Sequence, residues 1–188
     1  QHAEFDNDRD TGLLRYMAKE GHIRHFAHAQ LSLRITSPIF VARQLLRSTV
    51  GLSINEISRR YVDSAPEFHV PSVWRSRPDG NIKQGSGEAI TEDTAYLDWV
   101  YRQGLYAARK AYDELLARGV APEMARMILP QSMLTTWIWT GSLAAFARVC
   151  GLRLDSHAQS ETREIAVQIA EICAEHFPHA WAALITEK

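Results

Sequence analysis

The sequence has few cysteines, no long apolar run and no excess of charge of one sign. Its 188 residues include only Cys150 and Cys173, too few for a disulfide framework and without a Cys-x-x-Cys spacing, which indicates a reducing, cytoplasmic setting. No stretch approaches the roughly 20 consecutive apolar residues that a bilayer span requires, and the polar, acidic start differs from a signal peptide. We therefore expect a soluble protein without a membrane partner.

The charges are balanced and dispersed. There are 21 Lys and Arg residues against 22 Asp and Glu residues, a net charge of −1, and the basic residues are interspersed with acids along the sequence. Nucleic acid is therefore not expected as a partner, because proteins that bind it concentrate basic residues on one face. A mononucleotide remains compatible, since two or three arginines can hold one phosphate. The length and the 46% of apolar residues fit one domain with a sizeable core.

Hydrophobic periodicity predicts a helix-rich α+β domain with few strands. Apolar and polar residues alternate over 29–36, as in a half-buried strand, and the β-branched and aromatic segment 135–140 favours a second strand. Helices are expected at 10–21, at 39–46 after an N-cap at Ser37 and a first-turn Pro38, at 97–119, at 121–129, at 143–150 and at about 156–175. The proline- and glycine-rich stretch 63–92 is expected to be a long ordered or lid-like loop.

The densest polar cluster lies in two neighbouring segments, 43–47 and 53–61. Helical spacings of three and four are expected to place Arg43, Gln44 and Arg47 on neighbouring surface. The second segment adds a carboxylate, hydroxyls and two further arginines, which are groups that bind phosphates, carboxylates and amide edges. A salt-bridged, solvent-exposed face is the alternative. The apolar residues just upstream indicate burial, which makes unpaired arginines costly and favours a bound ligand.

Several separated motifs follow one another in a recognisable order. They are Gly21-His22 before Phe26 and His28, the run 37–44 (SPIFVARQ), Asn55-Glu56-x-Ser58-x-Arg60-Tyr61, the loop segment 83–87 (KQGSG), the run 125–130 (ARMILP) and the run 152–159 (LRLDSHAQ). Together they resemble flavin-dependent thymidylate synthases over nearly the whole chain from about residue 10. The resemblance implies a helix-rich α+β fold around a small, mainly antiparallel sheet. Residues 1–188 are expected to form a single domain without the N-terminal strand with which family members usually begin.

The resemblance also implies a dUMP site and a flavin site. The positions that match the family's dUMP site are Gln44, Arg47, Glu56, Ser58, Arg59, Arg60, Arg126 and Arg153. Arg153 is the catalytic candidate, because its counterpart assists ionisation of N3 of the pyrimidine. The positions that match the flavin site are His22, Arg47, Ser48, Thr49, Glu56, Ser142, Ala144 and Arg148. Ser48 stands where the family's Arg-His-Arg motif has histidine, and the segment that follows is one residue longer.

The function implied by the resemblance is the reductive methylation of dUMP to dTMP. FAD is the implied cofactor, and NADPH and methylenetetrahydrofolate are the implied co-substrates. Members of the family form homotetramers with shared active sites, so Arg153 is expected to serve the nucleotide of a neighbouring subunit. Two alternatives remain open: a pyrimidine-nucleotide hydroxymethylase on the same scaffold, and a catalytically silent homologue that binds nucleotide or flavin.

Neither cysteine nor metal chemistry is expected to carry the reaction. Cys150 and Cys173 lie in apolar helical segments typical of core thiols, and a reduced flavin removes the need for a cysteine nucleophile because it supplies the electrons itself. His22, His25 and His28 could suggest a metal site. On a helix, however, the first and third would be about 600° apart in rotation and would lie on different faces, so no metal is expected.

Overall fold

The computed structural model of the chain describes residues 5–62, 64–78, 80 and 85–185. The chain forms two compact units. The first unit comprises Gln1–Leu33, Arg47–Ile54 and Trp139–Lys188, and the second comprises Arg34–Leu46 and Asn55–Ile138. Within the described ranges, no helix is both long enough and apolar enough to cross a membrane.

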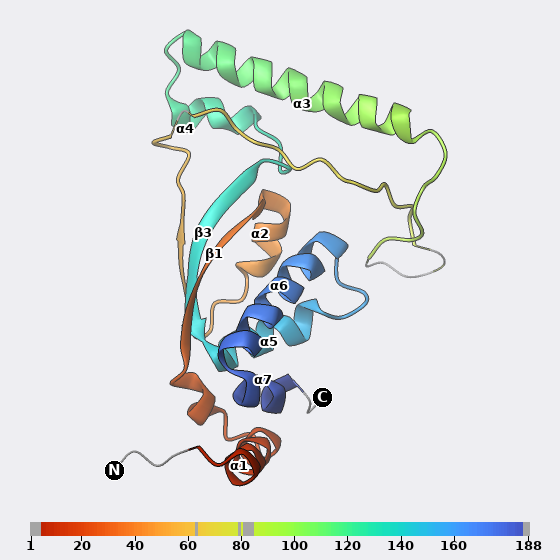
Figure 1. Cartoon of the computed structure of the whole chain (residues 1–188). Helices are drawn as coiled ribbons and strands as arrows, with labels where there is room; N and C mark the ends of the chain where they lie inside the picture. The colour runs from red at the N-terminus through yellow and green to blue at the C-terminus, as the bar shows by residue number, and fades with distance from the viewer. Residues whose placement is uncertain (1–4, 63, 79, 81–84, 186–188) are drawn as a thin grey trace. The chain divides into compact units, whose positions relative to one another are not determined.

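Three strands form one small sheet with the order β1, β3, β2 (Figure 1). They are β1 (Gln30–Pro38), β2 (Leu52–Glu56) and β3 (Leu134–Ser142). Two hydroxyl pairs show that β1 and β3 are antiparallel: Ser32 Oγ lies 2.8 Å from Thr140 Oγ1, and Thr36 Oγ1 lies 2.8 Å from Thr136 Oγ1. The predicted α+β class with a small antiparallel sheet is confirmed.

Strand β2 was not expected from the sequence. It lies on the other side of β3 and is also antiparallel to it, because Ile57 N–H donates to Thr136 O at 2.9 Å and Ser142 N–H donates to Gly51 O at 3.4 Å. Its residues are exposed along almost the whole strand. Leu52 and Ile54 alternate with Ser53 and Asn55, but this signal covers only four residues and overlaps the dense polar cluster at 53–61.

The first unit is built from helices that bury a common apolar core. They are α1 (Asn7–Lys19), the 3₁₀ helix η1 (Ile23–Ala27), α5 (Leu143–Arg153), α6 (Ser160–His176) and α7 (Pro178–Ile185). Phe146 of α5, Ile169 of α6 and Trp181 of α7 are buried, and these three helices pack against one another (Figure 1). Cys150 and Cys173 lie in the same core, and burial raises the pKa of each thiol to about 12. The prediction that both are core thiols is confirmed.

The second unit contains α2 (Ile39–Leu45), α3 (Thr94–Ala117), α4 (Pro122–Ala125) and the 3₁₀ helix η2 (Arg126–Ile128). In its described part, the long loop predicted at 63–92 contains no helix or named strand and runs beside α3 (Figure 1). Hydrogen bonds attach it to α3: Trp74 Nε1 donates to Asp98 at 2.7 Å, and the Tyr101 hydroxyl donates to His69 O at 2.8 Å. The described part of the loop is therefore held by side chains of α3.

Several predicted helix boundaries are wrong. Strand β1 continues through Pro38, and the Ser37 hydroxyl donates to Pro38 O at 3.3 Å, so Ser37 is not an N-cap. Helix α2 ends at Leu45, which leaves Arg47 outside the helix and removes the expected helical cluster with Arg43 and Gln44. Helix α5 runs on to Arg153 without stopping before Gly151, α6 begins at Ser160, and the helix expected at 121–129 is one α-helical turn followed by η2.

Candidate functional site

The second unit contains a cavity of about 640 Å³, within the range of small-molecule sites. Four of the residues expected at the nucleotide site line it: Glu56, Ser58, Arg59 and Arg126. They come from the end of β2, from the loop after it and from η2. The cavity therefore brings together side chains that are far apart in the sequence.

Glu56 is the last residue of β2 and is held by a buried hydroxyl. Thr135, which is 7% exposed, donates from Oγ1 to Glu56 Oε1 at 2.6 Å. A short O–H···O⁻ bond of this kind is stronger than a hydrogen bond between neutral groups. Glu56 also lines a second cavity of about 270 Å³ in the same unit.

Arg59 and Arg126 line the same cavity but differ in how their donors are used. The Arg59 guanidinium donates to Ser64 O and Ala65 O, so it holds the following loop in place. Arg126 donates only from Nε, to Glu123 O at 3.3 Å, and its two terminal nitrogens have no hydrogen bond to the residues that the structure describes. Arg126 is thus the better placed of the two to bind an anion.

Ser58, which lines the cavity, is linked to Arg60, and Arg60 is linked to Tyr61. Ser58 Oγ accepts from Arg60 N and from Arg60 Nε, each at 3.4 Å. The Arg60 guanidinium lies over the Tyr61 ring, 5.0 Å from its centroid. Arg60 itself does not line the cavity, and neither does Gln44, which is half-buried on α2.

Sequence reasoning missed several polar residues that line the cavity, among them Thr36, Glu67 and Thr135. Thr36 and Thr135 were seen only as parts of expected strands, and Glu67 as part of the long loop. Alternation indicates that a strand residue is buried or exposed, but it does not indicate which strand end opens onto a cavity. No local signal in the sequence distinguishes these three residues.

In the first unit, the turn after Arg47 packs against the start of α5. Ser142 caps this helix by accepting from Ala145 N at 3.2 Å. A Cβ placed on Gly51 would lie 3.3 Å from Ala145 Cβ, and the Arg148 guanidinium donates to Val50 O. Two segments expected near the flavin, 47–49 and 142–148, are therefore neighbours.

The residues of these two segments have different environments. Arg47 is exposed and makes no hydrogen bond or ion pair with any residue in the described ranges. Arg148, expected as a flavin contact, holds the turn through the carbonyl of Val50. His22, the remaining flavin candidate, is exposed between α1 and η1, with its ring 6.5 Å from that of Tyr16.

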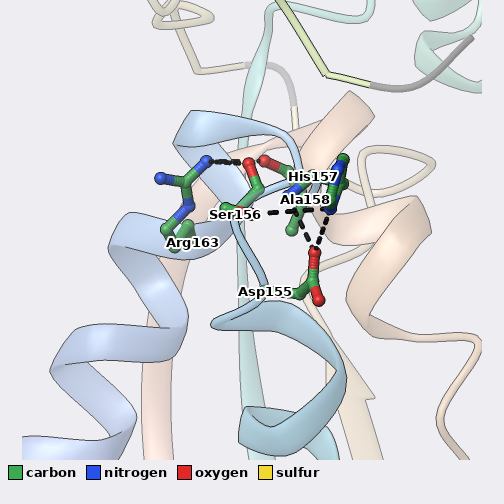
Figure 2. Close-up of polar contacts among 5 residues, drawn as sticks. All are labelled: Asp155, Ser156, His157, Ala158 and Arg163. Carbon is green, nitrogen blue, oxygen red and sulfur yellow. Dashed lines mark hydrogen bonds and ion pairs between the residues drawn. The ribbon is translucent and has the colours of Figure 1, made fainter. Parts of the chain in front are cut away.

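Arg153 is the last residue of α5 and is half-buried. Figure 2 shows the turn that follows it. Asp155 Oδ1 accepts from His157 N at 2.8 Å and from His157 Nδ1 at 2.9 Å, and these contacts lower the pKa of Asp155. The Arg163 guanidinium donates to Ser156 O at 2.9 Å and to Ala158 O at 3.0 Å. The turn after Arg153 is therefore held at both its side chains and its backbone.

The adjacent Asp155, Ser156 and His157 are not a nucleophilic triad. A triad needs the hydroxyl on one imidazole nitrogen and the carboxylate on the other. Here Ser156 Oγ and Asp155 Oδ1 both lie at His157 Nδ1, at 3.5 and 2.9 Å. These three residues shape the turn.

Comparison with known proteins identifies the class of enzyme. The family described as thymidylate synthase complementing protein matches residues 1–179. The flavin-dependent thymidylate synthase of Thermosipho africanus is 35% identical over 182 residues, covering 95% of this chain and 78% of that protein. Its counterpart from Thermus thermophilus is 37% identical over 174 residues, covering 93% of this chain and 63% of that protein.

A solved structure shows the same fold. A UMP/dUMP methylase from Streptomyces cacaoi, bound with 5-Br dUMP, superposes with a TM-score of 0.87 at 26% identity, over 98% of this chain and 82% of that one. The fold and the sequence matches thus define an enzyme of pyrimidine-nucleotide methylation. The chain belongs to the family of flavin-dependent thymidylate synthases, and the resemblance drawn from the motifs is confirmed.

Proposed function

We propose that this chain catalyses the reductive methylation of dUMP to dTMP, with FAD as cofactor and NADPH and methylenetetrahydrofolate as co-substrates. The observation that carries the proposal is the 640 Å³ cavity, which is lined by Arg126, Glu56 and Ser58. The two terminal nitrogens of Arg126 have no hydrogen-bond partner among the described residues. An arginine fork suits the phosphate of the nucleotide, and the carboxylate suits an N–H or O–H donor of its base or sugar. Family membership and the methylase bound with 5-Br dUMP support this substrate class.

The two thiols support a flavin rather than a cysteine nucleophile. A thiol must ionise to attack carbon 6 of a pyrimidine, and burial raises the pKa of Cys150 and of Cys173 to about 12. When bound, FAD supplies reducing electrons to the reaction. The free thiols also support a reducing compartment, which we propose is the cytoplasm.

The first unit offers groups that fit the flavin. The turn before Gly51 carries the hydroxyls of Ser48 and Thr49, and Arg47 adds a guanidinium without a partner in the described ranges. We propose that Arg47, Ser48 and Thr49 hold the cofactor, while Ser142 and Arg148 keep the turn in place. Arg153 stabilises the negative charge that develops at N3 of the pyrimidine.

Product analysis tests the proposed function. The purified protein, with bound flavin verified by its absorbance spectrum, is incubated with dUMP, NADPH and methylenetetrahydrofolate, and the nucleotide is analysed by mass spectrometry. We expect a product with the mass of dTMP, absent when either co-substrate is omitted. A hydroxymethylated nucleotide would identify the alternative enzyme, and dUMP binding without NADPH oxidation would identify a silent homologue. UMP is assayed in parallel, because the Streptomyces relative is a UMP/dUMP methylase.

We also propose that the active enzyme is a homotetramer. Helix α3 has one buried residue, Tyr112, whereas Tyr96, Trp99 and Tyr106 are 57–65% exposed. A row of exposed aromatic side chains on one helix is typical of a protein interface. We expect light scattering to give the mass of four chains. Trp99→Glu should reduce this mass, whereas Lys19→Glu, a surface change on α1, should not. A fully active monomer would contradict the proposal.

A further inference from the structure

The hydroxyl of Thr135 has an unusual partner for a strand threonine. The two other threonines of β3, Thr136 and Thr140, pair with hydroxyls of β1, at Thr36 and Ser32. Thr135 donates to the carboxylate of Glu56 at 2.6 Å. A bond between a hydroxyl and an ionised carboxylate is about twice as strong as one between two neutral groups. Of the three, Thr135 therefore exerts the strongest hold on its partner.

Thr135 and Glu56 differ in how strongly the fold restrains their side chains. Thr135 is 7% exposed and lies in the central strand of the sheet. Glu56 is exposed at the end of an edge strand. An exposed glutamate without a partner populates several rotamers. The donor from the central strand thus restrains a side chain that would otherwise be mobile.

The hydrogen bond from Thr135 determines which carboxylate oxygen of Glu56 remains available to a ligand. Glu56, Ile57 and Thr136 line both the 640 Å³ cavity and the 270 Å³ cavity, so Glu56 lies where the two spaces adjoin. The bond from Thr135 engages Oε1. Oε2 is left as the acceptor for a ligand in the cavity.

We propose that Thr135 is a positioning residue for substrate recognition: it holds Glu56 so that the free carboxylate oxygen accepts a hydrogen bond from an N–H or O–H group of the bound pyrimidine nucleotide. This inference rests on the proposed function, because it takes dUMP as the ligand of the cavity. Thr135 acts through Glu56 and does not itself touch the substrate.

Isosteric substitution separates the hydroxyl from the packing of the side chain. Thr135→Val keeps the shape of the side chain and removes the donor, and we expect it to weaken dUMP binding about 10-fold in calorimetric titration. Thr135→Ser keeps the donor and is expected to bind dUMP nearly as the wild type does. Thr140→Val is the matched control, since it removes a hydroxyl from the same strand at a pair that does not involve Glu56. It is expected to leave dUMP affinity unchanged.

A double-mutant cycle tests whether the effect passes through Glu56. In a Glu56→Gln background, Thr135→Val is expected to change dUMP affinity much less than in the wild type, because the ionised acceptor is gone. Melting temperatures are recorded for every variant. Should Thr135→Val fail to fold, Thr135→Cys replaces it, with a weak donor and an expected loss between those of valine and serine.

Three results would overturn the inference. They are wild-type affinity in Thr135→Val, an equal loss in Thr140→Val, and a loss that persists undiminished in the Glu56→Gln background. Absence of dUMP binding by the wild type would overturn the proposed function together with the inference. Binding by the wild type with no effect at Thr135 would overturn the inference alone.

Discussion

Replacing Arg153 with alanine is expected to lower kcat for dUMP methylation by about 10²–10³-fold, because one preorganised donor to a developing anion contributes that much to the rate. The guanidinium stays protonated at neutral pH, so it stabilises an N3 anion without acting as a base. Its position at the end of α5, before the turn held by Asp155, His157 and Arg163, suits a group that must keep one orientation. Steady-state assays of product formation measure the change.

The control for this substitution is an arginine on the surface. Arg118 is exposed and pairs with Glu114 at 2.6 Å, so Arg118→Ala removes a guanidinium without reaching either proposed site. We expect its kcat to match that of the wild type. The flavin absorbance of Arg153→Ala should also be retained, since Arg153 is assigned to the pyrimidine. An unchanged kcat in Arg153→Ala would exclude it as the catalytic residue.

Replacing Arg126 with alanine is expected to raise the Kd for dUMP by about 10- to 100-fold, the value of a hydrogen bond to a charged group. Arg126 lines the cavity, and its two terminal nitrogens have no protein partner in the described ranges, so their donors are available to a phosphate. Arg126→Lys should recover part of the affinity, because an ammonium keeps the charge but loses the bidentate geometry. Calorimetric titration with dUMP measures all three proteins.

The nucleoside deoxyuridine distinguishes a phosphate contact from a general effect on the cavity. It lacks the phosphate, so wild type and Arg126→Ala are expected to bind it equally weakly. A loss of the same size for dUMP and deoxyuridine would show that Arg126 does not bind the phosphate. Co-expression of Arg153→Ala with Arg126→Ala then tests the shared site: if one chain's Arg153 serves another chain's cavity, mixed oligomers contain intact sites and regain part of the activity.

Much of the fold was predictable from local patterns. The alternation of apolar and polar residues identified β1 and β3, and the 3.6-residue period identified α1, α3 and α6. Errors occurred where a boundary depends on distant contacts. The start of α2 is an example, because Ile39 N–H donates to Met133 O at 2.9 Å after β1 has continued through Pro38. Strand β2 was missed because an exposed edge strand is stabilised by its neighbour and not by its own pattern.

For the candidate site, too, the sequence indicated one part and the tertiary structure decided the other. The order and spacing of motifs along the sequence were enough to indicate the family and the substrate class and to name candidate site residues, since the chemistry of a nucleotide site requires certain side chains at certain positions. Only the tertiary structure shows which of these side chains keep hydrogen-bond donors that no other protein group uses. The sequence gives no reason to distinguish Arg59 from Arg126 as a ligand for the nucleotide. In the structure, the Arg59 guanidinium donates to the backbone of the loop at Ser64, whereas Arg126 makes no hydrogen bond to the described part of that loop. Only the pairing of β2 with β3 brings Thr135 to Glu56, because hydrogen bonds between distant segments depend on strand register, which no local pattern specifies.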